Sequence, residues 1–160
     1  MQEAASARPN SRIQVSNLTM AFGRNVIQRN LTFDVYEGDI FVIMGGSGCG
    51  KSTLLKHMLG LIEPAAGDIA YSGVSFTAAN AQLRGDMRRQ WGITYQSGGL
   101  FSAMTLAENV ALPLGLYTES SAEEIADVVA YKLALVGLAG YQDFLPAEIS
   151  GGMRKRAALA

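Results

Sequence analysis

The chain has 160 residues, enough to bury one hydrophobic core, and its 49% hydrophobic and 17% charged residues are typical of a soluble globular domain. With 13 basic and 14 acidic side chains the net charge is −1, which gives no reason to expect nucleic acid or an anionic membrane surface as the main partner. The single cysteine, Cys49, excludes an internal disulfide framework and a multi-thiolate metal site, and it fits a reducing, cytosolic setting.

The chain begins with a segment that carries no folding signal. Residues 1–11 are polar and small and lack the apolar stretch of a signal peptide, so we expect a flexible tail. No apolar run is long enough to span a bilayer. Residues 12–160 are expected to form one partial domain.

Two kinds of strand and a helix are predicted next. Residues 13–20 and 31–36 alternate apolar and polar side chains, as half-exposed strands do. Residues 40–44 are continuously apolar and bounded by glycines, which predicts a strand buried on both faces in a parallel sheet. Residues 51–61 carry apolar side chains at helical spacing and predict a helix.

The second half predicts mainly helices. Short strands are expected over residues 67–73 and 91–95, separated by a polar helix over residues 82–89. Three further helix starts share a good N-capping residue. They are Thr105, whose helix Pro113 should limit, Ser121, and Ser150, whose helix should run over residues 151–160 without a stop signal.

A phosphate-binding loop follows the strand expected at residues 40–44. Residues 45–52 read Gly-Gly-Ser-Gly-Cys-Gly-Lys-Ser and match G-x-x-x-x-G-K-[ST], with a strand expected before and a helix after. The glycines let backbone N–H groups point inward around an anion, and the start of the next helix adds partial positive charge. The alternative, a glycine-rich turn that precedes a lysine by chance, is disfavoured because the whole pattern rarely occurs in this context.

The loop residues have separate tasks in binding ATP with Mg²⁺. Lys51 is expected to bridge the β- and γ-phosphates, Ser52 to ligate magnesium, and Thr53 to add a hydroxyl near the α-phosphate. All residues expected to touch the nucleotide here lie in the loop or the first helical turn: Gly45, Gly46, Ser47, Gly48, Cys49, Gly50, Lys51, Ser52 and Thr53.

Three segments together resemble the ATP-binding-cassette (ABC) family. Residues 149–153, Ile-Ser-Gly-Gly-Met, resemble the signature usually written LSGGQ, and residues 41–53 look like that family's form of the P-loop. Residues 95–101, Tyr-Gln-Ser-Gly-Gly-Leu-Phe, resemble its Q-loop. The resemblance implies an α/β P-loop NTPase of the ABC type, incomplete at the C-terminus. Its parts would be a mixed sheet around the P-loop helix, an antiparallel β part and a helical subdomain at about residues 100–150.

The resemblance also implies a composite site. In the family a head-to-tail dimer holds ATP between the P-loop of one copy and the signature of the other, so four residues would bind in trans: Ser150, Gly151, Gly152 and Met153. A helix start at Ser150 is itself a second candidate anion site. Gln96 would approach magnesium and the attacking water, with Ser52 as the other metal ligand. Phe22 lies where the family stacks an aromatic ring on adenine, although it would serve equally well as a core residue.

Residues 96–101, 109–113 and 148–160 resemble one subgroup closely, the ATPases of phospholipid-trafficking transporters that maintain outer-membrane lipid asymmetry. In that group methionine follows Ser-Gly-Gly, so Met153 supports the narrower resemblance. It implies a transmembrane permease, a lipid-binding subunit of the MCE type, a small cytosolic helper and a place at the cytoplasmic face of the inner membrane; no nucleic acid is implied.

Alternatives remain. The catalytic glutamate and switch histidine that the family carries after the signature have no counterpart in the sequence, so we expect the 160-residue chain to be inactive alone. It could be a truncated remnant that at most binds nucleotide, or serve an importer of another solute. A DNA-repair or chromosome ATPase is disfavoured because the interval between the motifs lacks sustained heptads and zinc-binding cysteines.

Several other residues have ordinary structural interpretations. His57 is expected to be a packed or surface helical residue, and Cys49 a passenger more than a redox switch. Carboxylates at turns and helix starts are not assigned as bases: Glu63, Asp68 and Glu108. Basic side chains that we expect to be solvated are Arg84, Arg88 and Arg89, and Arg154, Lys155 and Arg156. Apolar residues that could form either core or a groove for a permease helix are Leu100, Phe101 and Met104.

Overall fold

The structure is a computed structural model that describes residues 11–96 and 98–160. The tail predicted over residues 1–11 therefore lies outside the described residues, except for Ser11, which begins the first strand. The chain divides into two compact units between Trp91 and Gly92. In the part that the structure describes, no helix is both long enough and apolar enough to cross a membrane.

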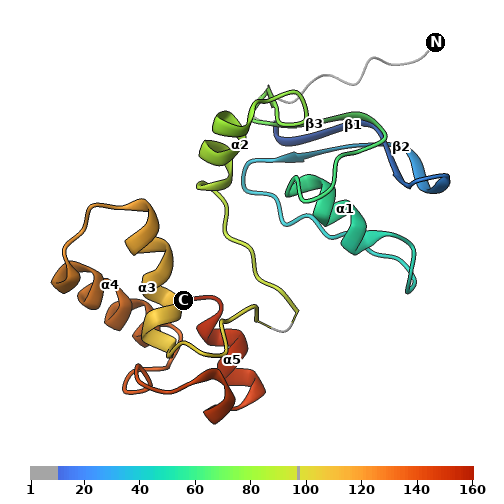
Figure 1. The fold of residues 1–160 in the computed structure, drawn as a ribbon. Helices are drawn as coiled ribbons and strands as arrows, with labels where there is room; N and C mark the ends of the chain where they lie inside the picture. Colours follow the sequence, from blue (N-terminus) through green and yellow to red (C-terminus); the bar gives the residue numbers. More distant parts are fainter. Residues whose placement is uncertain (1–10, 97) are drawn as a thin grey trace. The chain divides into compact units, whose positions relative to one another are not determined.

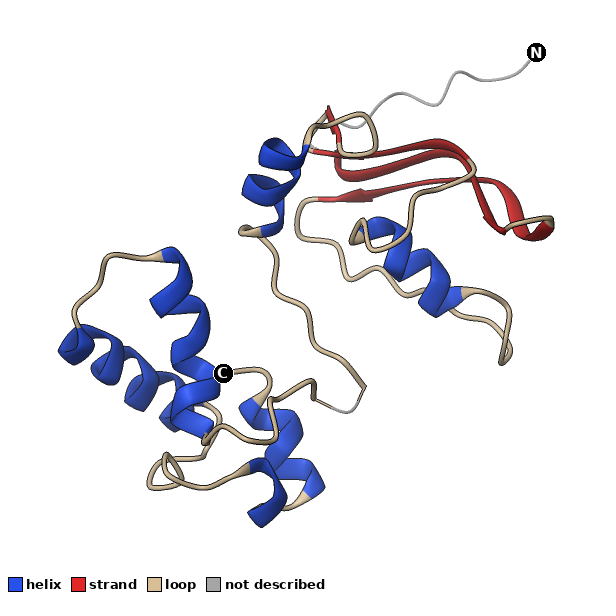
Figure 2. Cartoon of the chain, in the orientation of Figure 1, coloured by secondary structure: helices blue, strands red, loops and turns tan. Residues whose placement is uncertain are grey.

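The first unit contains the sheet (Figures 1 and 2). Its strands are β1 (Ser11–Phe22), β2 (Asn25–Tyr36), β3 (Ala66–Tyr71) and β4 (Val74–Ser75), in the order β2-β1-β3-β4 with every pair antiparallel. The two alternating segments predicted as half-exposed strands lie inside β1 and β2, so that prediction is confirmed.

Helix α1 (Lys51–Met58) packs against this sheet (Figure 1). The buried cluster between them consists of Val15, Leu18, Met20, Leu54, Met58 and Ile69. The core therefore fixes the position of α1, the element that follows the phosphate-binding loop.

Helix α2 (Ala81–Arg88) completes the first unit. It begins at Asn80, whose side chain accepts a 2.9 Å hydrogen bond from the Leu83 N–H.

The strand predicted over residues 40–44 does not form. The segment has no strand assignment, and Ile40 and Met44 are 95% and 85% exposed. A strand buried on both faces needs a neighbour to take its ladder hydrogen bonds, and among the described residues no strand pairs with it. Phe41 stacks on Phe33 of the sheet, with ring centroids 5.1 Å apart. The mixed sheet expected of the fold is thus represented by its antiparallel part alone.

The strand predicted over residues 91–95 is also wrong in its extent. This stretch is irregular, and its one pairing is an isolated bridge between Tyr95 and Gly98. The polar helix predicted just before it is confirmed as α2, shifted by one residue.

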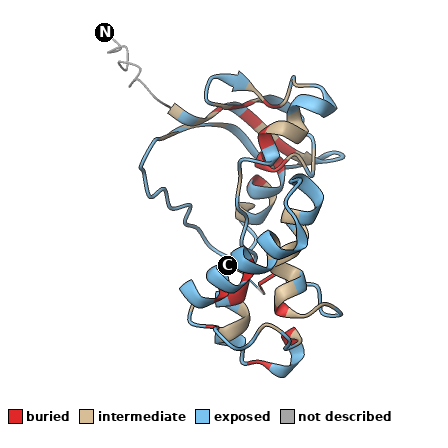
Figure 3. Ribbon diagram, turned by 90° about the vertical axis from the view of Figure 1, so that its left-hand side faces the viewer, coloured by how far each residue is buried: buried red, intermediate tan, exposed pale blue. Residues whose placement is uncertain are grey.

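The second unit is helical. Its elements are α3 (Leu106–Tyr117), α4 (Ala122–Leu135), the 3₁₀ helix η1 (Pro146–Glu148) and α5 (Gly151–Ala157). The predicted N-caps Thr105 and Ser121 are both present, and Glu108 and Glu124 complete a capping box with each. The unit has a buried cluster of its own (Figure 3), made of Leu106, Val129, Leu133, Leu138, Ile149 and Ala157.

Three helix ends differ from expectation. Helix α1 ends at Met58, three residues before the predicted limit at residue 61. Helix α3 runs through Pro113 to Tyr117 instead of stopping there. Because Pro113 is exposed, water can solvate the carbonyl group that loses its intrahelical donor. Helix α5 starts at the predicted cap, Ser150, but ends at Ala157, three residues before the expected limit.

Candidate phosphate-binding site

Lys51 stands at the start of α1 and folds back over the loop that precedes it. Its Nζ donates to the carbonyl oxygens of Gly45 at 2.8 Å and Gly46 at 2.7 Å, and lies 3.6 Å from the Sγ of Cys49. The loop is exposed to solvent almost throughout. An exposed ammonium group held by two loop carbonyl groups and the Cys49 sulfur can exchange these contacts for an anion that enters the loop.

The N-terminus of α1 differs from the other helix starts. Its N-cap is Gly50, in the left-handed conformation with φ 100°, and no side chain caps the helix. The remaining described α-helices all have a capping side chain: Asn80, Thr105, Ser121 and Ser150. The first turn of α1 also contains no acidic residue. Its N–H groups are therefore free to bind an external anion, which the helix dipole further favours.

Gly50 also packs closely on the β1–β2 hairpin. A Cβ atom at this position would lie 2.8 Å from Cγ2 of Ile27 and 3.3 Å from Cε of Met20. Together with the positive φ, this excludes any larger residue without strain. The loop is thus seated on the hairpin at the point where the helix begins.

An open cavity of about 320 Å³ lies beside this contact. Its lining combines hairpin residues with the loop and α1: Met20, Gln28, Leu31, Ile43, Met44, Gly45, Cys49, Gly50, Lys51 and Leu54. From the sheet, Met20 and Leu31 contribute apolar side chains and Gln28 a polar one, and Lys51 lines the cavity from the start of α1.

Phe22 is the last residue of β1, two residues beyond Met20. It is 51% exposed, which excludes the interpretation of Phe22 as an ordinary core residue. Its strand partner is Asn25, two residues before Ile27. Ile27 is the residue whose side chain lies against Gly50. The ring is therefore displayed on the same hairpin that supports the loop, and stacking on adenine stays a prediction.

The other predicted site residues belong to the second unit. Gln96 is exposed in a tight turn closed by a 2.9 Å hydrogen bond from the Gly98 N–H to the Tyr95 carbonyl. Ser150 caps α5, its Oγ accepting from the Met153 N–H at 3.2 Å, and Gly151 and Gly152 are exposed.

Arg154 is not solvated as expected. Its Nη1 donates to the carbonyl oxygens of Pro146 at 3.3 Å and Ile149 at 3.4 Å, which braces the turn before Ser150. Lys155 and Arg156 are exposed, as predicted.

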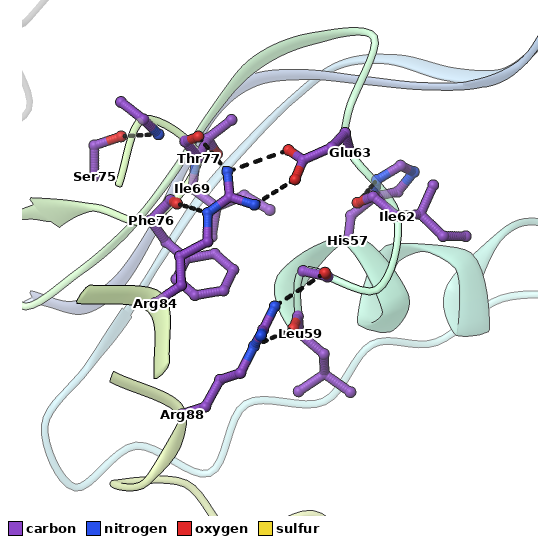
Figure 4. A network of polar contacts seen from close by, with 12 residues as sticks. His57, Leu59, Ile62, Glu63, Ile69, Ser75, Phe76, Thr77, Arg84 and Arg88 are labelled. Carbon is purple, nitrogen blue, oxygen red and sulfur yellow. Dashed lines mark hydrogen bonds and ion pairs between the residues drawn. The ribbon is translucent and has the colours of Figure 1, made fainter. Parts of the chain in front are cut away.

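The carboxylates that we set aside as bases all have structural partners. Glu108 completes the capping box with Thr105, and Asp68 accepts a 2.6 Å hydrogen bond from the Ser75 hydroxyl. Glu63 pairs with Arg84, and the hydrogen bond from that guanidinium lowers the pKa of the carboxyl below its usual value (Figure 4). Within the described ranges no three His, Cys, Asp or Glu side chains converge as a metal site.

His57 was expected to be either a packed or a surface residue of a helix, and the structure shows that it is packed inside the protein. It is 1% exposed, and its Nδ1 lies 2.9 Å from the Ile62 carbonyl (Figure 4). Among Leu100, Phe101 and Met104 the outcome is mixed, because Leu100 packs against the core of the second unit whereas Phe101 is 59% exposed.

The prediction that Arg84 is solvated is wrong, whereas Arg88 is exposed, as predicted, and has backbone partners as well. Both side chains reach back from α2 to backbone carbonyl groups of the first unit (Figure 4). Arg84 donates to Phe76 O at 2.9 Å, and Arg88 donates to Leu59 O at 3.1 Å. These two carbonyl groups lie 8 residues from Arg84 and 29 residues from Arg88 in the chain, and Arg84 also pairs with Glu63, so the charge pattern of the helix alone carried no signal of these contacts.

Comparison with known proteins places these features in one family. The ABC transporter family matches residues 28–160. The probable ribonucleotide transport ATP-binding protein mkl of Mycobacterium leprae is 43% identical over 148 residues, which are 92% of this chain and 43% of that protein. The intermembrane phospholipid transport system ATP-binding protein MlaF of Haemophilus influenzae is 40% identical, over 92% of this chain and 56% of its own length. In Escherichia coli strain K12, MlaF is 37% identical, over 92% and 55%. The chain thus spans about half the length of these curated relatives.

Solved structures of ABC cassettes resemble this chain as well. The dimeric structure of a bacterial ABC transporter cassette matches with a TM-score of 0.81 and 28% identity, over 91% of this chain and 66% of that one. A dimeric, post-hydrolysis state of an ATP-binding cassette bound to ADP and Pi matches with a TM-score of 0.80 and 27% identity, over 92% and 67%.

Proposed function

The chain belongs to the ABC transporter family, and on that premise we propose that it is the ATP-binding subunit of a transporter that moves phospholipids. One observation supports nucleotide binding most directly: alone among the described α-helices, α1 begins without a capping side chain, and its first residue is Lys51. Such a helix start binds phosphate. The ADP-bound state of a similar cassette supports the same ligand class.

The residues of the first unit fit the parts of ATP with Mg²⁺. The loop from Gly45 to Gly50 would cradle the phosphates, and Lys51 would neutralise charge on the β- and γ-phosphates. Mg²⁺, when bound, would supply further charge neutralisation on these oxygens, with Ser52 and Gln96 as protein ligands. Phe22 would stack on adenine, since an exposed aromatic ring binds any flat base face.

Hydrolysis is proposed to need a second copy and a membrane partner. Dimers of similar cassettes support a head-to-tail pair in which Ser150, Gly151, Gly152 and Met153 complete the site of the other copy. The exposed N-terminus of α5 suits that role. A transmembrane permease, a lipid-binding MCE-type subunit and a small cytosolic helper complete the proposed assembly at the cytoplasmic face of the inner membrane.

The cargo rests on resemblance, because an ATP-binding subunit of this kind does not hold the substrate. The MlaF relatives serve phospholipid transport, whereas the mkl relative is named for ribonucleotides. We favour phospholipid because the Q-loop segment at residues 96–101 and the signature segment at residues 148–160 resemble that subgroup. Ribonucleotide or another solute is the alternative outcome of the test.

The test uses the full-length protein with its permease in proteoliposomes. We expect ATP hydrolysis accompanied by movement of labelled phospholipid between membranes, and Lys51→Ala should lower hydrolysis by about 100-fold, the scale on which loss of one charge-stabilising donor acts. Lys56→Ala, an exposed lysine on the same helix, is the matched control and should retain activity. Unchanged ATP turnover in Lys51→Ala would contradict the assignment of the loop as the nucleotide site. Transport of ribonucleotide without phospholipid would contradict the proposed substrate.

A further inference from the structure

The side chain of Asn109 on α3 holds the backbone of the segment that follows Gln96. Its Oδ1 accepts a 2.7 Å hydrogen bond from the Phe101 N–H, and its Nδ2 donates to the Phe101 carbonyl at 3.1 Å. The same Nδ2 lies 3.0 Å from the carbonyl oxygen of Met104 and 2.9 Å from that of Thr105. An amide accepts and donates at once, so Asn109 binds both polar groups of the Phe101 backbone.

The helix itself does not require these contacts. Thr105 caps α3 and Glu108 completes the capping box, so the start of the helix already has its side-chain partners. An asparagine inside a helix is intrinsically less favourable than an alanine. The two hydrogen bonds with Phe101 offset that cost, and they hold the loop rather than the helix.

Contacts within the chain join Phe101 to the tight turn that carries Gln96. Gly99 has φ +75°, and a Cβ atom there would lie 2.9 Å from Cδ2 of Tyr95, so this ring lies directly against Gly99. The Gly98 N–H donates a 2.9 Å hydrogen bond to the Tyr95 carbonyl and closes the turn. Because Tyr95 is bonded directly to Gln96, a displacement of this segment would also move Gln96.

The helical unit holds the same segment at its other end. A Cβ atom at Gly98 would lie 3.4 Å from the Arg154 carbonyl oxygen and 3.5 Å from the Cβ of Ala158, so the turn lies against α5. Between these contacts and Asn109, Leu100 packs against the buried cluster of the unit. All of these residues belong to the second compact unit. The segment is thus fixed by α5 at one end and by Asn109 at the other.

We propose that Asn109 is a positioning residue for Gln96, because it fixes the backbone segment that holds the Gln96 turn. The proposal rests on the proposed function, in which Gln96 is a ligand of Mg²⁺ and approaches the attacking water. Since the Gln96 side chain is exposed, the backbone turn sets where it can reach. Residues that hold a metal ligand in place change metal affinity and turnover without touching the ion.

The first measurement needs no ligand. Backbone ¹⁵N order parameters of the full-length protein report fast motion at Gln96 and Gly98, and Asn109→Ala should lower them from about 0.85, the rigid range, to about 0.6 or less. Val129 in the buried cluster should keep its wild-type value. Ser121→Ala, which removes the cap of α4 in the same unit, is the matched control and should leave the turn unchanged. Unchanged order parameters at Gln96 and Gly98 in Asn109→Ala overturn the proposal.

The second measurement is ATP hydrolysis by the full-length protein with its permease over a series of Mg²⁺ concentrations. Asn109→Ala should lower kcat by about 10-fold and raise the Mg²⁺ concentration for half-maximal rate by about 10-fold. KM for ATP at saturating Mg²⁺ should stay within about twofold, because the phosphates bind the loop of the first unit. Asn109→Asp keeps an acceptor for the Phe101 N–H but offers no donor to the carbonyl groups, so it should not restore activity. Ser121→Ala should match wild type.

A double-mutant cycle separates positioning from a general loss of stability. In a Gln96→Ala background, Asn109→Ala should cause no further loss of kcat, because the residue that it positions is gone. Full additivity, an unchanged kcat in Asn109→Ala, wild-type activity in Asn109→Asp, or a change in KM alone overturns the proposal. Should Asn109→Ala fail to fold, Asn109→Ser, whose hydroxyl cannot bind both polar groups of Phe101, is judged by the same criteria. If Lys51→Ala hydrolyses ATP as wild type does, the proposed function fails; if Lys51→Ala is impaired and Asn109→Ala is not, only this inference fails.

Discussion

The ion pair between Glu63 and Arg84 makes the contribution of Glu63 to folding stability depend on pH. The hydrogen bond from Arg84, the largest cause, lowers the pKa of the Glu63 carboxyl below 4.5, its ordinary value. The folded state therefore favours the ionised form, and the resulting stability is present above pH 4.5 and lost as the pH falls through the lower, folded-state pKa. Because Glu63 is 63% exposed, solvent screens most of this effect.

Glu63→Gln should reduce the free energy of unfolding at neutral pH by at most about 1 kcal/mol, the upper range for an exposed pair. The difference from wild type should shrink as the pH falls below 4.5, where the wild-type carboxyl also becomes neutral. Urea unfolding at a series of pH values measures it. A difference that stays constant or grows in acid contradicts the assigned pairing.

At the scale of elements, α2 contains a glycine that packing does not require. Gly85 lies inside the helix, and a Cβ atom there would meet nothing within 4 Å. Gly85→Ala should therefore raise the free energy of unfolding by about 0.5–1 kcal/mol, because alanine loses less backbone entropy in a helix. Gly60→Ala is the matched comparison and should destabilise, because its Cβ would clash with Phe76 and Arg88. Chemical denaturation measures both, and a destabilised Gly85→Ala would contradict the described helix.

Elements defined by local signals were predictable from the sequence. Thr105 and Ser121 are each followed three residues later by a glutamate, a pattern that predicts a helix start, and both capping boxes form. The strand expected at residues 40–44 did not form, because a strand depends on a neighbour that a local apolar run cannot supply. The backbone contacts of Arg88 were not predictable for a related reason, because its acceptors, Leu59 and Gly60, lie 29 and 28 residues earlier in the chain.

The same distinction holds for the candidate site. The loop from Gly45 to Ser52 was recognisable because its residues are contiguous and each has a chemical task. What the sequence could not show is that Gly50 lies against Ile27 of the hairpin, because that contact depends on the three-dimensional structure. The contact strengthens the interpretation of the loop as a phosphate site.

At the scale of the whole molecule, the chain consists of two units that each have a buried core. The phosphate-binding loop and Phe22 belong to the first, and Gln96 and the signature at residues 149–153 to the second. Phosphate binding by the loop is the part that the first unit should perform by itself.

That claim is tested most directly by titrating the ¹⁵N-labelled protein with ATP and Mg²⁺ while recording backbone amide spectra. The amide signals of residues 45–53 should move most, since their N–H groups would bind the phosphates, and Lys51→Ala should abolish these shifts at the same ATP concentration. Shifts confined to other segments, or identical shifts in Lys51→Ala and wild type, would contradict the assignment of this loop as the nucleotide site.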